Sequence, residues 1–422
     1  MKLIWRNIWR NSRRAKITIA SVFFAVFFCT LMNSVVNGLW EKMRDDALRT
    51  QTGHIQIHKR GYWDDKTIDN FMTMDAAVIG GLEALDNIEN ISPRIMIAAM
   101  ASYGTQSKGV IITGISPAKE REKSNLPIRV AQGRYLSEND DGILIGEGLA
   151  GYLSVGVGDT VVFIGQGYHG ASAVGLFPVR GLLRMPSIEM DNGLVYMTLQ
   201  TTQSFIDMPD GYSGILVSIQ KEKLLNETMK AISYQLSGNS NENPDIRQPA
   251  TSPYPLQMGT DDYEVLPWMV TMEEMMKTSA SHKGLVRMIM LVLYLIVGFG
   301  ILGTVIMMTN ERKREFAMMI SLGMSRRRLK VATVLELILL TVTGVALATA
   351  VSVPLTYYFS LNPIPLTGDI AQAYIELGME AVLITTCETS VFITQTLTVL
   401  FFAGLTFTYP VSKIGKLKLT SK

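Results

Sequence analysis

The chain has few of the residues that most enzymes use for chemistry. Its 422 residues include only two cysteines, Cys29 and Cys387, and four histidines. These cysteines are too far apart for a disulfide framework, and no Cys/His spacing matches a zinc site. His54 and His58 could form a metal pair on one helix face. However, the stretch G-H-I-Q-I-H alternates as a strand does, so we favour a strand without metal.

Catalytic and nucleotide-binding motifs are also missing from the sequence. It contains no G-x-x-x-x-G-K-[ST] loop, no G-x-S-x-G elbow and no H-E-x-x-H helix. The acidic pairs Asp140–Asp141, Asp261–Asp262 and Glu273–Glu274 stand in polar surroundings, where solvated surface positions explain them. We therefore expect no enzyme, and no metal or cofactor held by this chain.

Charge is scarce as well. Only 18% of the residues are charged and 48% are apolar, whereas about 25% charged is usual for a soluble domain. The net charge of +2 gives no reason to expect a nucleic-acid partner, because the positive residues stand beside apolar runs instead of forming one face. The composition therefore indicates a partner of another kind, the lipid bilayer.

Four windows exceed the ~18 uncharged residues that a membrane-spanning helix needs. They are Ile17–Trp40, Met288–Asn310, Leu337–Phe359 and Thr389–Ser412. With flanking residues, we place the spans at 17–40, 286–310, 331–359 and 389–412. The first window is too long for a signal-peptide core and no small-x-small site follows it, so we expect an uncleaved helix.

Positive residues between the spans predict the orientation. The leader 1–16 holds six Lys and Arg, the connector 311–330 holds seven and the tail 413–422 holds four, while the loop 360–388 holds none. Positive segments stay in the cytoplasm. Both termini and the connector are therefore predicted to be cytoplasmic, and residues 41–284 and 360–388 to lie outside. In the leader, Ile4, Trp5, Ile8 and Trp9 recur at helical spacing and favour an amphipathic interfacial helix, although a plain positive anchor would also fit.

The outer segment 41–284 is predicted to be one large or two small α+β domains. Short apolar or alternating runs predict strands at His54–His58, Val110–Thr113, Gly142–Ile145, Thr160–Ile164, Leu194–Met197 and Gly214–Ile219. Helical patterns cover Asp75–Leu85, Glu147–Leu153 and Lys223–Leu236. Two excursions are expected as solvated loops that could contact a partner. They are the Pro-rich Gly238–Asp262 and Gly165–Gly175, which surrounds Tyr168 and His169.

Several motifs in this order resemble one family, the permease subunits of MacB/FtsX-like (type VII, mechanotransmission) ABC transporters. They are R-N-I-W-R-N-S-R-R-A-K-I-T-I-A (6–20), T-G-H-I-Q-I (52–57), I-L-I-G-E-G-L-A-G-Y-L-S-V-G-V-G-D-T-V (143–161), V-R-G-L-L-R-M-P-S-I-E-M-D-N-G-L-V-Y-M-T-L (179–199) and the connector E-R-K-R-E-F-A-M-M-I-S-L-G-M-S-R-R-R-L. Ala317 and Ile320 depart from the family's usual connector. Within the family, the second and fourth motifs look most like the lipoprotein-releasing (Lol-type) permeases.

The resemblance implies a fold and a set of partners. It implies four transmembrane helices with an extracytoplasmic α+β domain of the MacB periplasmic-core type, in a bacterial inner membrane. Two copies of a separate ATPase subunit would bind ATP and Mg, and a second permease, identical or related, would complete the assembly. The Lol-type branch implies lipoprotein release, with a periplasmic lipoprotein carrier. MacB-like efflux and FtsX-like activation of a cell-wall hydrolase are the alternatives, and the large outer segment argues against the second.

The connector is the predicted ATPase-docking element, and Glu311–Gly323 has the composition of a short helix. A plain membrane-anchoring loop is the alternative. Its docking residues are Glu311, Arg312, Arg314, Glu315, Phe316, Met318, Met319, Leu322 and Gly323. Glu336 lies close by at the membrane interface and is expected to pair with Arg327 or Arg328, or to snorkel.

A lipid-anchored substrate is expected between the first two spans, where flexible Met side chains suit variable acyl chains. In this hypothesis the first span and the outer domain move relative to the other three spans. The residues predicted to face the substrate are Met32, Asn33, Val36 and Trp40 in the first span and Met288, Leu291, Val292 and Leu295 in the second.

Overall fold

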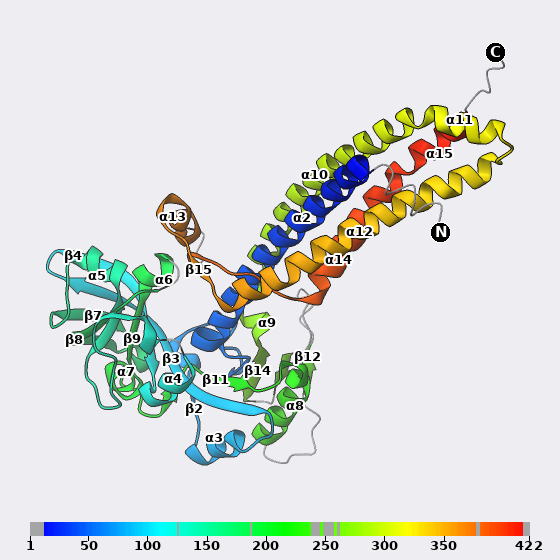
Figure 1. The fold of residues 1–422 in the computed structure, drawn as a ribbon. Coiled ribbons are helices and arrows are strands. Elements are labelled where there is room, and N and C mark those ends of the chain that lie inside the picture. Colours follow the sequence, from blue (N-terminus) through cyan, green and yellow to red (C-terminus); the bar gives the residue numbers. More distant parts are fainter. Residues whose placement is uncertain are drawn as a thin grey trace. The chain divides into compact units, whose positions relative to one another are not determined.

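The computed structural model describes residues 12–124, 126–185, 188–237, 245–247, 257–259, 262–376 and 380–416 (Figure 1). The chain divides into two compact units. Unit 1 comprises residues 1–41, 278–366 and 382–422, and unit 2 comprises residues 42–277 and 367–381. The leader positions Ile4, Trp5, Ile8 and Trp9 lie outside the described residues.

Unit 1 is a bundle of long helices. In the described part of the chain, four helices are long and apolar enough to cross a membrane, as the sequence predicts. They are α2 (Ser12–Ala47), α10 (Glu273–Glu311), α12 (Arg326–Leu361) and α14 (Thr389–Thr406), which α15 (Thr408–Gly415) continues. The short helix α11 (Lys313–Ser321) joins α10 to α12. The pair β15 (Ile364–Pro365) and β16 (Val382–Leu383) flanks α13 (Gly368–Glu376), which belongs to unit 2.

One apolar core joins α2, α10, α12 and α14. Val22 and Val26 of α2 pack with Ile301 of α10, Leu340 of α12 and Val399 of α14. Both α2 and α10 extend past the predicted spans, because the backbone hydrogen bonds of each helix continue into the polar residues that flank its apolar run. The boundary between the units therefore falls within α2 and α10 and not at a helix end.

Unit 2 is built on one large sheet flanked by short helices. Its strands are β1 (Ile55–Lys59), β3 (Ile88–Tyr103), β4 (Gln106–Ile115), β5 (Val130–Gly133), β6 (Ile143–Gly146), β7 (Thr160–Gln166), β8 (Ser172–Leu183), β9 (Leu194–Thr198), β11 (Gly214–Ile219), β12 (Asp245–Arg247), β13 (Gln257–Gly259) and β14 (Tyr263–Pro267). A separate small pair joins β2 (Met72–Thr73) to β10 (Gly211–Tyr212). The helices are α3 (Ala76–Glu83), α4 (Pro117–Lys123), α5 (Glu147–Leu153), α6 (Ile188–Gly193), α7 (Leu199–Ile206), α8 (Leu225–Leu236) and α9 (Trp268–Thr271), and the π-helical turn η1 (Leu48–Thr52) leads into β1. The predicted α+β class, its six strands and its three helices are confirmed.

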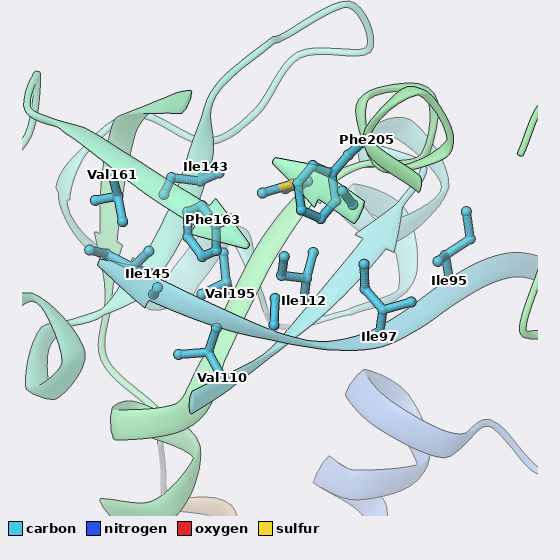
Figure 2. Packing of buried hydrophobic residues seen from close by; sticks show 14 of the residues in the cluster. Ile95, Ile97, Val110, Ile112, Ile143, Ile145, Val161, Phe163, Val195 and Phe205 are labelled. Carbon is cyan, nitrogen blue, oxygen red and sulfur yellow. The ribbon is translucent and has the colours of Figure 1, made fainter. Parts of the chain in front are cut away.

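Two cores share the strand β3. Its second half pairs with β4 and β7, and the strands β3, β4, β9, β6, β8 and β7 close into a ring because β7 also pairs with β8. Ile95, Ile112, Phe163 and Val195 fill this ring (Figure 2). The first half of β3 pairs with β11 and lies over a second core with β1, β14 and α8.

One loop prediction is wrong, and a second is contradicted only by the strands described within it. Gly165–Gly175 is a β-hairpin, since β7 and β8 pair from Thr160↔Pro178 through Gln166↔Ser172 and only a short turn at Tyr168–Gly170 separates them. Alternating small residues fit this hairpin because they pack over Phe205 and Phe177. In the range 238–262, the described residues 245–247 and 257–259 form the paired strands β12 and β13; the rest, apart from residue 262, lies outside the described residues.

Candidate functional site

The connector folds into the helix α11, which is bounded by two distinct backbone features. At its start, only Arg312 separates it from α10, and Glu315 stands in its first turn, where a negative charge suits the positive helix end. At its end, Gly323 adopts φ of +96°, a conformation that glycine tolerates best. Ser325 then caps α12 by accepting a hydrogen bond from the Arg328 backbone N–H.

The inner face of α11 is occupied by packing within unit 1. Phe316 is only 2% exposed and packs with Leu329 of α12 and Ile414, near the end of α15. Met319 and Ile320 lie partly buried against the same cluster. Phe316 therefore holds α11 on the bundle and is not available to an ATPase, which corrects the sequence-based prediction for this residue.

Arg312 is also buried, at 3% exposure. Its Nη1 donates to Glu336 Oε2 of α12 at 2.8 Å, its Nε lies 3.4 Å from Glu315 Oε2, and its guanidinium lies 5.6 Å from the centroid of the Phe316 ring. Glu336 thus pairs with Arg312 and not with Arg327 or Arg328 as predicted. The pair connects the end of α10 to α12, so Arg312 positions α11 and does not face a partner.

The outward side of the connector is apolar and basic. Met318 is 60% exposed and Leu322 81%, and Met324 is exposed beside them. Glu311, Lys313 and Arg314 are exposed too, as is the whole run from Ser321 to Arg328. We define the candidate docking surface as Met318, Leu322, Met324, Lys313, Arg314, Arg327 and Arg328. Met324, Arg327 and Arg328 are not among the docking residues predicted from sequence, although their place after the Gly323 turn could have suggested them.

The predicted substrate-facing residues divide into two groups. On α10, Met288, Leu291, Val292 and Leu295 are all exposed, and on α2 Met32 is exposed while Asn33 and Val36 are half-buried. Trp40 is buried, with its ring centroid 5.6 Å from that of His282 on α10. Trp40 is therefore a contact between two helices and not an open cavity wall.

Buried polar groups in unit 2 serve its folding. Asp140 is not solvated as predicted: it is buried and pairs with Arg134 at 2.5 Å and Arg180 at 2.9 Å. Burial raises the pKa of Asp140, but hydrogen bonds from Arg180, Arg134 and the Gly142 N–H outweigh that effect and lower the pKa overall. His58 lies in strand β1, as predicted, and among the described residues no group of His, Cys, Asp and Glu could hold a metal.

A second buried pair holds the chain where α2 ends. Arg94 of β3 and Glu120 of α4 are both 3% exposed and lie 2.6 Å apart. Arg94 Nη1 also donates to the Gln51 carbonyl of η1 at 3.2 Å, and Ser92 Oγ donates to Glu120 at 2.9 Å. The π-helical turn is therefore fixed to β3 by a buried charge.

Two family models match consecutive parts of the chain. The MacB-like periplasmic core domain matches residues 16–234, and the FtsX-like permease C-terminal region matches residues 287–419. Among individual relatives, the lipoprotein-releasing system transmembrane protein LolE of Haemophilus influenzae is 21% identical over 304 residues. That match covers 70% of this chain and 66% of LolE, just under two thirds of the relative.

Solved structures with some likeness are extracytoplasmic domains. The extracellular domain of the noncanonic ABC-type transporter YknZ from Gram-positive bacteria is 16% identical with a TM-score of 0.35, and the match covers 50% of this chain and 98% of that one. The periplasmic region of MacB from Actinobacillus actinomycetemcomitans is 14% identical with a TM-score of 0.37, covering 56% and 98%.

Proposed function

Because the chain belongs to the family of ABC-transporter permeases with a MacB-like periplasmic core domain and an FtsX-like C-terminal region, we propose that it couples a partner ATPase to the release of lipoproteins from the inner membrane. Membership implies an ATPase partner and a multi-pass place in the bacterial inner membrane. The observation that carries the coupling proposal is α11, an exposed apolar and basic helix fixed on its other side to α12 and α15.

The docking surface would receive the ATPase. Met318 and Leu322 would enter an apolar groove, since a few well-packed and desolvated side chains near the centre of an interface carry most of its binding energy. Lys313, Arg314, Arg327 and Arg328 would surround them and select an acidic rim by charge complementarity. The partner, and not this chain, would bind ATP and Mg.

Movement of the ATPase would reach the bundle through the inner face of α11. Phe316 contacts Leu329 and Ile414, and Arg312 is paired with Glu336, so displacement of α11 has to displace α12 or break these contacts. Breaking a buried ion pair by removing one partner costs about 3–5 kcal/mol. Such a cost favours joint movement of α11 and α12.

Lipoprotein as the cargo is supported by the similarity to LolE. The exposed apolar residues of α10, with Met32 and Val36 of α2, would contact the acyl chains, for which flexible thioethers are suited. We further propose an assembly of two permeases, identical or related, with two ATPases, and delivery to a periplasmic carrier.

Purification of the intact complex from its native membrane tests both parts of the proposal, the coupling to an ATPase and the release of lipoproteins. Mass spectrometry of the purified sample is expected to identify an ABC ATPase and acylated lipoproteins. Recovery of the ATPase with a hydrolase or with small-molecule cargo, and without lipoprotein, would overturn lipoprotein release and favour the efflux or hydrolase alternative. Absence of any ATPase would overturn coupling itself.

A further inference from the structure

The part of α2 after its apolar centre lies directly against the segment that precedes α14. A Cβ added to Gly38 would lie 2.7 Å from the Thr385 carbonyl carbon, 2.8 Å from the Thr386 nitrogen and 2.9 Å from the Ile384 oxygen. These neighbours are backbone atoms, which cannot rotate away as a flexible side chain can. Gly38 is therefore the residue that lets the two backbones touch.

Hydrogen bonds in both directions join the same elements. The Thr386 N–H donates to the Ser34 carbonyl at 3.0 Å, and the Ser34 hydroxyl donates to the Thr386 carbonyl. Ser34 is fully buried and Thr386 nearly so. A buried backbone group that loses its partner costs about 1–3 kcal/mol, so two such bonds resist separation.

The segment also contacts α12. The Thr385 hydroxyl donates to the Thr356 carbonyl of α12 at 2.6 Å, and Cys387 Sγ lies 3.4 Å from the Thr356 hydroxyl. Thr356 and Thr385 are both buried. Residues 384–387, which we name the 384–387 clasp, therefore contact α2 on one side and α12 on the other.

A second close approach joins the same two helices. A Cβ added to Gly344 of α12 would lie 2.8 Å from Val22 Cβ and 3.0 Å from the Ile19 carbonyl oxygen of α2. At this position the Val22 side chain and the Ile19 carbonyl of α2 thus lie directly against the backbone of α12. Two separate positions along α2 are therefore fixed to α12, one directly and one through the clasp.

From these contacts we infer that the 384–387 clasp makes α2 move together with α12 when the partner ATPase works, so that Ser34, Gly38, Thr385 and Thr386 are positioning residues for coupling. The inference rests on the proposed function and replaces the expectation that the first span moves against the other three. A displacement of α11 passes to α12 through Arg312–Glu336 and from α12 to α2 through the clasp. Among the four spans, α10 is the least buried, and apart from Arg312 next to its end it takes no part in these contacts.

Cysteine cross-linking of the full complex tests this inference. Ser34→Cys with Thr386→Cys is introduced into a chain carrying Cys29→Ala and Cys387→Ser, which removes both native thiols. The small oxidant copper phenanthroline is applied to the complex without nucleotide and after trapping with ATP and vanadate, so that the two thiols are oxidised to a disulfide. We expect the same yield of cross-linked product in both states, and an ATPase activity in the cross-linked complex equal to that of the same double-cysteine variant before cross-linking. Loss of the product on trapping, or loss of ATPase activity on cross-linking, would overturn the inference.

Glycine variants provide a matched pair. Gly38→Leu is expected to lose most of the cross-linked product, because its side chain would meet the clasp backbone. Gly303→Leu, in the span α10 where an added Cβ has nothing within 4 Å, is expected to keep it. Equal yields in both variants would contradict the close contact. Recovery of the ATPase in the same pull-down distinguishes failure of the proposed function from failure of the clasp inference. If the unmodified chain recovers no ATPase, the proposed function is overturned. If the ATPase is recovered but the cross-link depends on the nucleotide state, only the clasp inference is overturned.

Discussion

The basic residues of the connector divide into two groups by burial. Arg312 is enclosed between α10, α11 and α12, whereas Arg327 and Arg328 are exposed. A hydropathy scale predicts that all three arginines are exposed to solvent, because it scores each charged residue without regard to a partner of opposite charge. A buried guanidinium needs a carboxylate close by, and the chain supplies Glu336 from a different helix.

Removal of that carboxylate should therefore be costly. We predict that Glu336→Leu lowers the free energy of unfolding by about 3–5 kcal/mol, measured by denaturant titration of the purified protein in detergent, because Arg312 loses its partner at 2.8 Å. Adding Arg312→Met should recover much of the loss. The control is Arg184→Leu, which breaks the exposed Arg184–Glu147 pair and should cost at most about 1 kcal/mol. Equal losses in the two single variants would show that burial does not decide the cost.

A second residue-scale prediction concerns His58. Burial lowers the pKa of His58 to about 4, against an ordinary 6.5, while its ring nitrogens lie 2.8 Å from the Ser213 carbonyl and 2.9 Å from Gln56 Oε1. Between these values the unfolded chain binds a proton that the folded chain does not. The stability of unit 2 is therefore present above pH 6.5 and falls by roughly 3 kcal/mol as the pH drops to 4. Denaturant titrations at several pH values should show a flatter profile for His58→Gln than for the exposed control His169→Gln. An unchanged profile in His58→Gln would contradict this assignment.

At the scale of single elements, α11 shows what a periodic pattern can and cannot predict. The sequence predicts a helix over the connector, and the helix is present from Lys313 to Ser321. It does not indicate which apolar residues face outward. Phe316 is buried because Leu329 and Ile414, from segments far along the chain, fill the space beside it.

The exposed part of this element should be the part that binds. We predict that Leu322→Asp reduces recovery of the ATPase in a pull-down by roughly thirtyfold, since an interface hot spot contributes about 2 kcal/mol. The variant should unfold like the unmodified chain, because Leu322 is 81% exposed. Ser321→Asp adds the same charge at the adjacent exposed position and is expected to have a small effect. Full recovery with Leu322→Asp would remove Leu322 from the docking surface.

Strands such as β1 and β11 could be predicted because apolar and polar residues alternate clearly along them. Strands that contain proline or several glycines could not, because these residues are typical of turns. The strands β3 and β8 were not predicted, because Pro93 and the small residues around Gly175 resemble turn signals. Both positions lie in paired strands: Pro93 is opposite Ile215 of β11, and Gly175 is opposite Phe163 of β7 and lies beside the rings of Phe177 and Phe205. Pairings such as Arg312–Glu336 or Ser34–Thr386 join residues far apart in sequence, and no local pattern indicates them.

At the scale of the whole molecule, the orientation of the four spans in the membrane is still a prediction from charge. Single cysteines at Ser321 and at His169, both exposed, would report it in the chain lacking Cys29 and Cys387. A membrane-impermeant thiol reagent applied to spheroplasts should label His169→Cys at once and Ser321→Cys only after permeabilisation, because positive connectors stay in the cytoplasm. The reverse pattern would invert the proposed topology.

The pairing of β1 with β14 has a consequence for how this architecture could be assembled. The chain begins its main sheet at Ile55, opposite Pro267, so the first and last long strands of unit 2 are hydrogen-bonded neighbours. Neighbouring entry and exit points are characteristic of domains that tolerate insertion into another protein. Residues 55–267, which contain all strands of the large sheet, thus have the anatomy of a domain inserted between α2 and α10 in the sequence. Replacing this domain by another whose ends lie equally close together would change the substrates or partners bound outside the membrane. The order and packing of the membrane helices would stay the same.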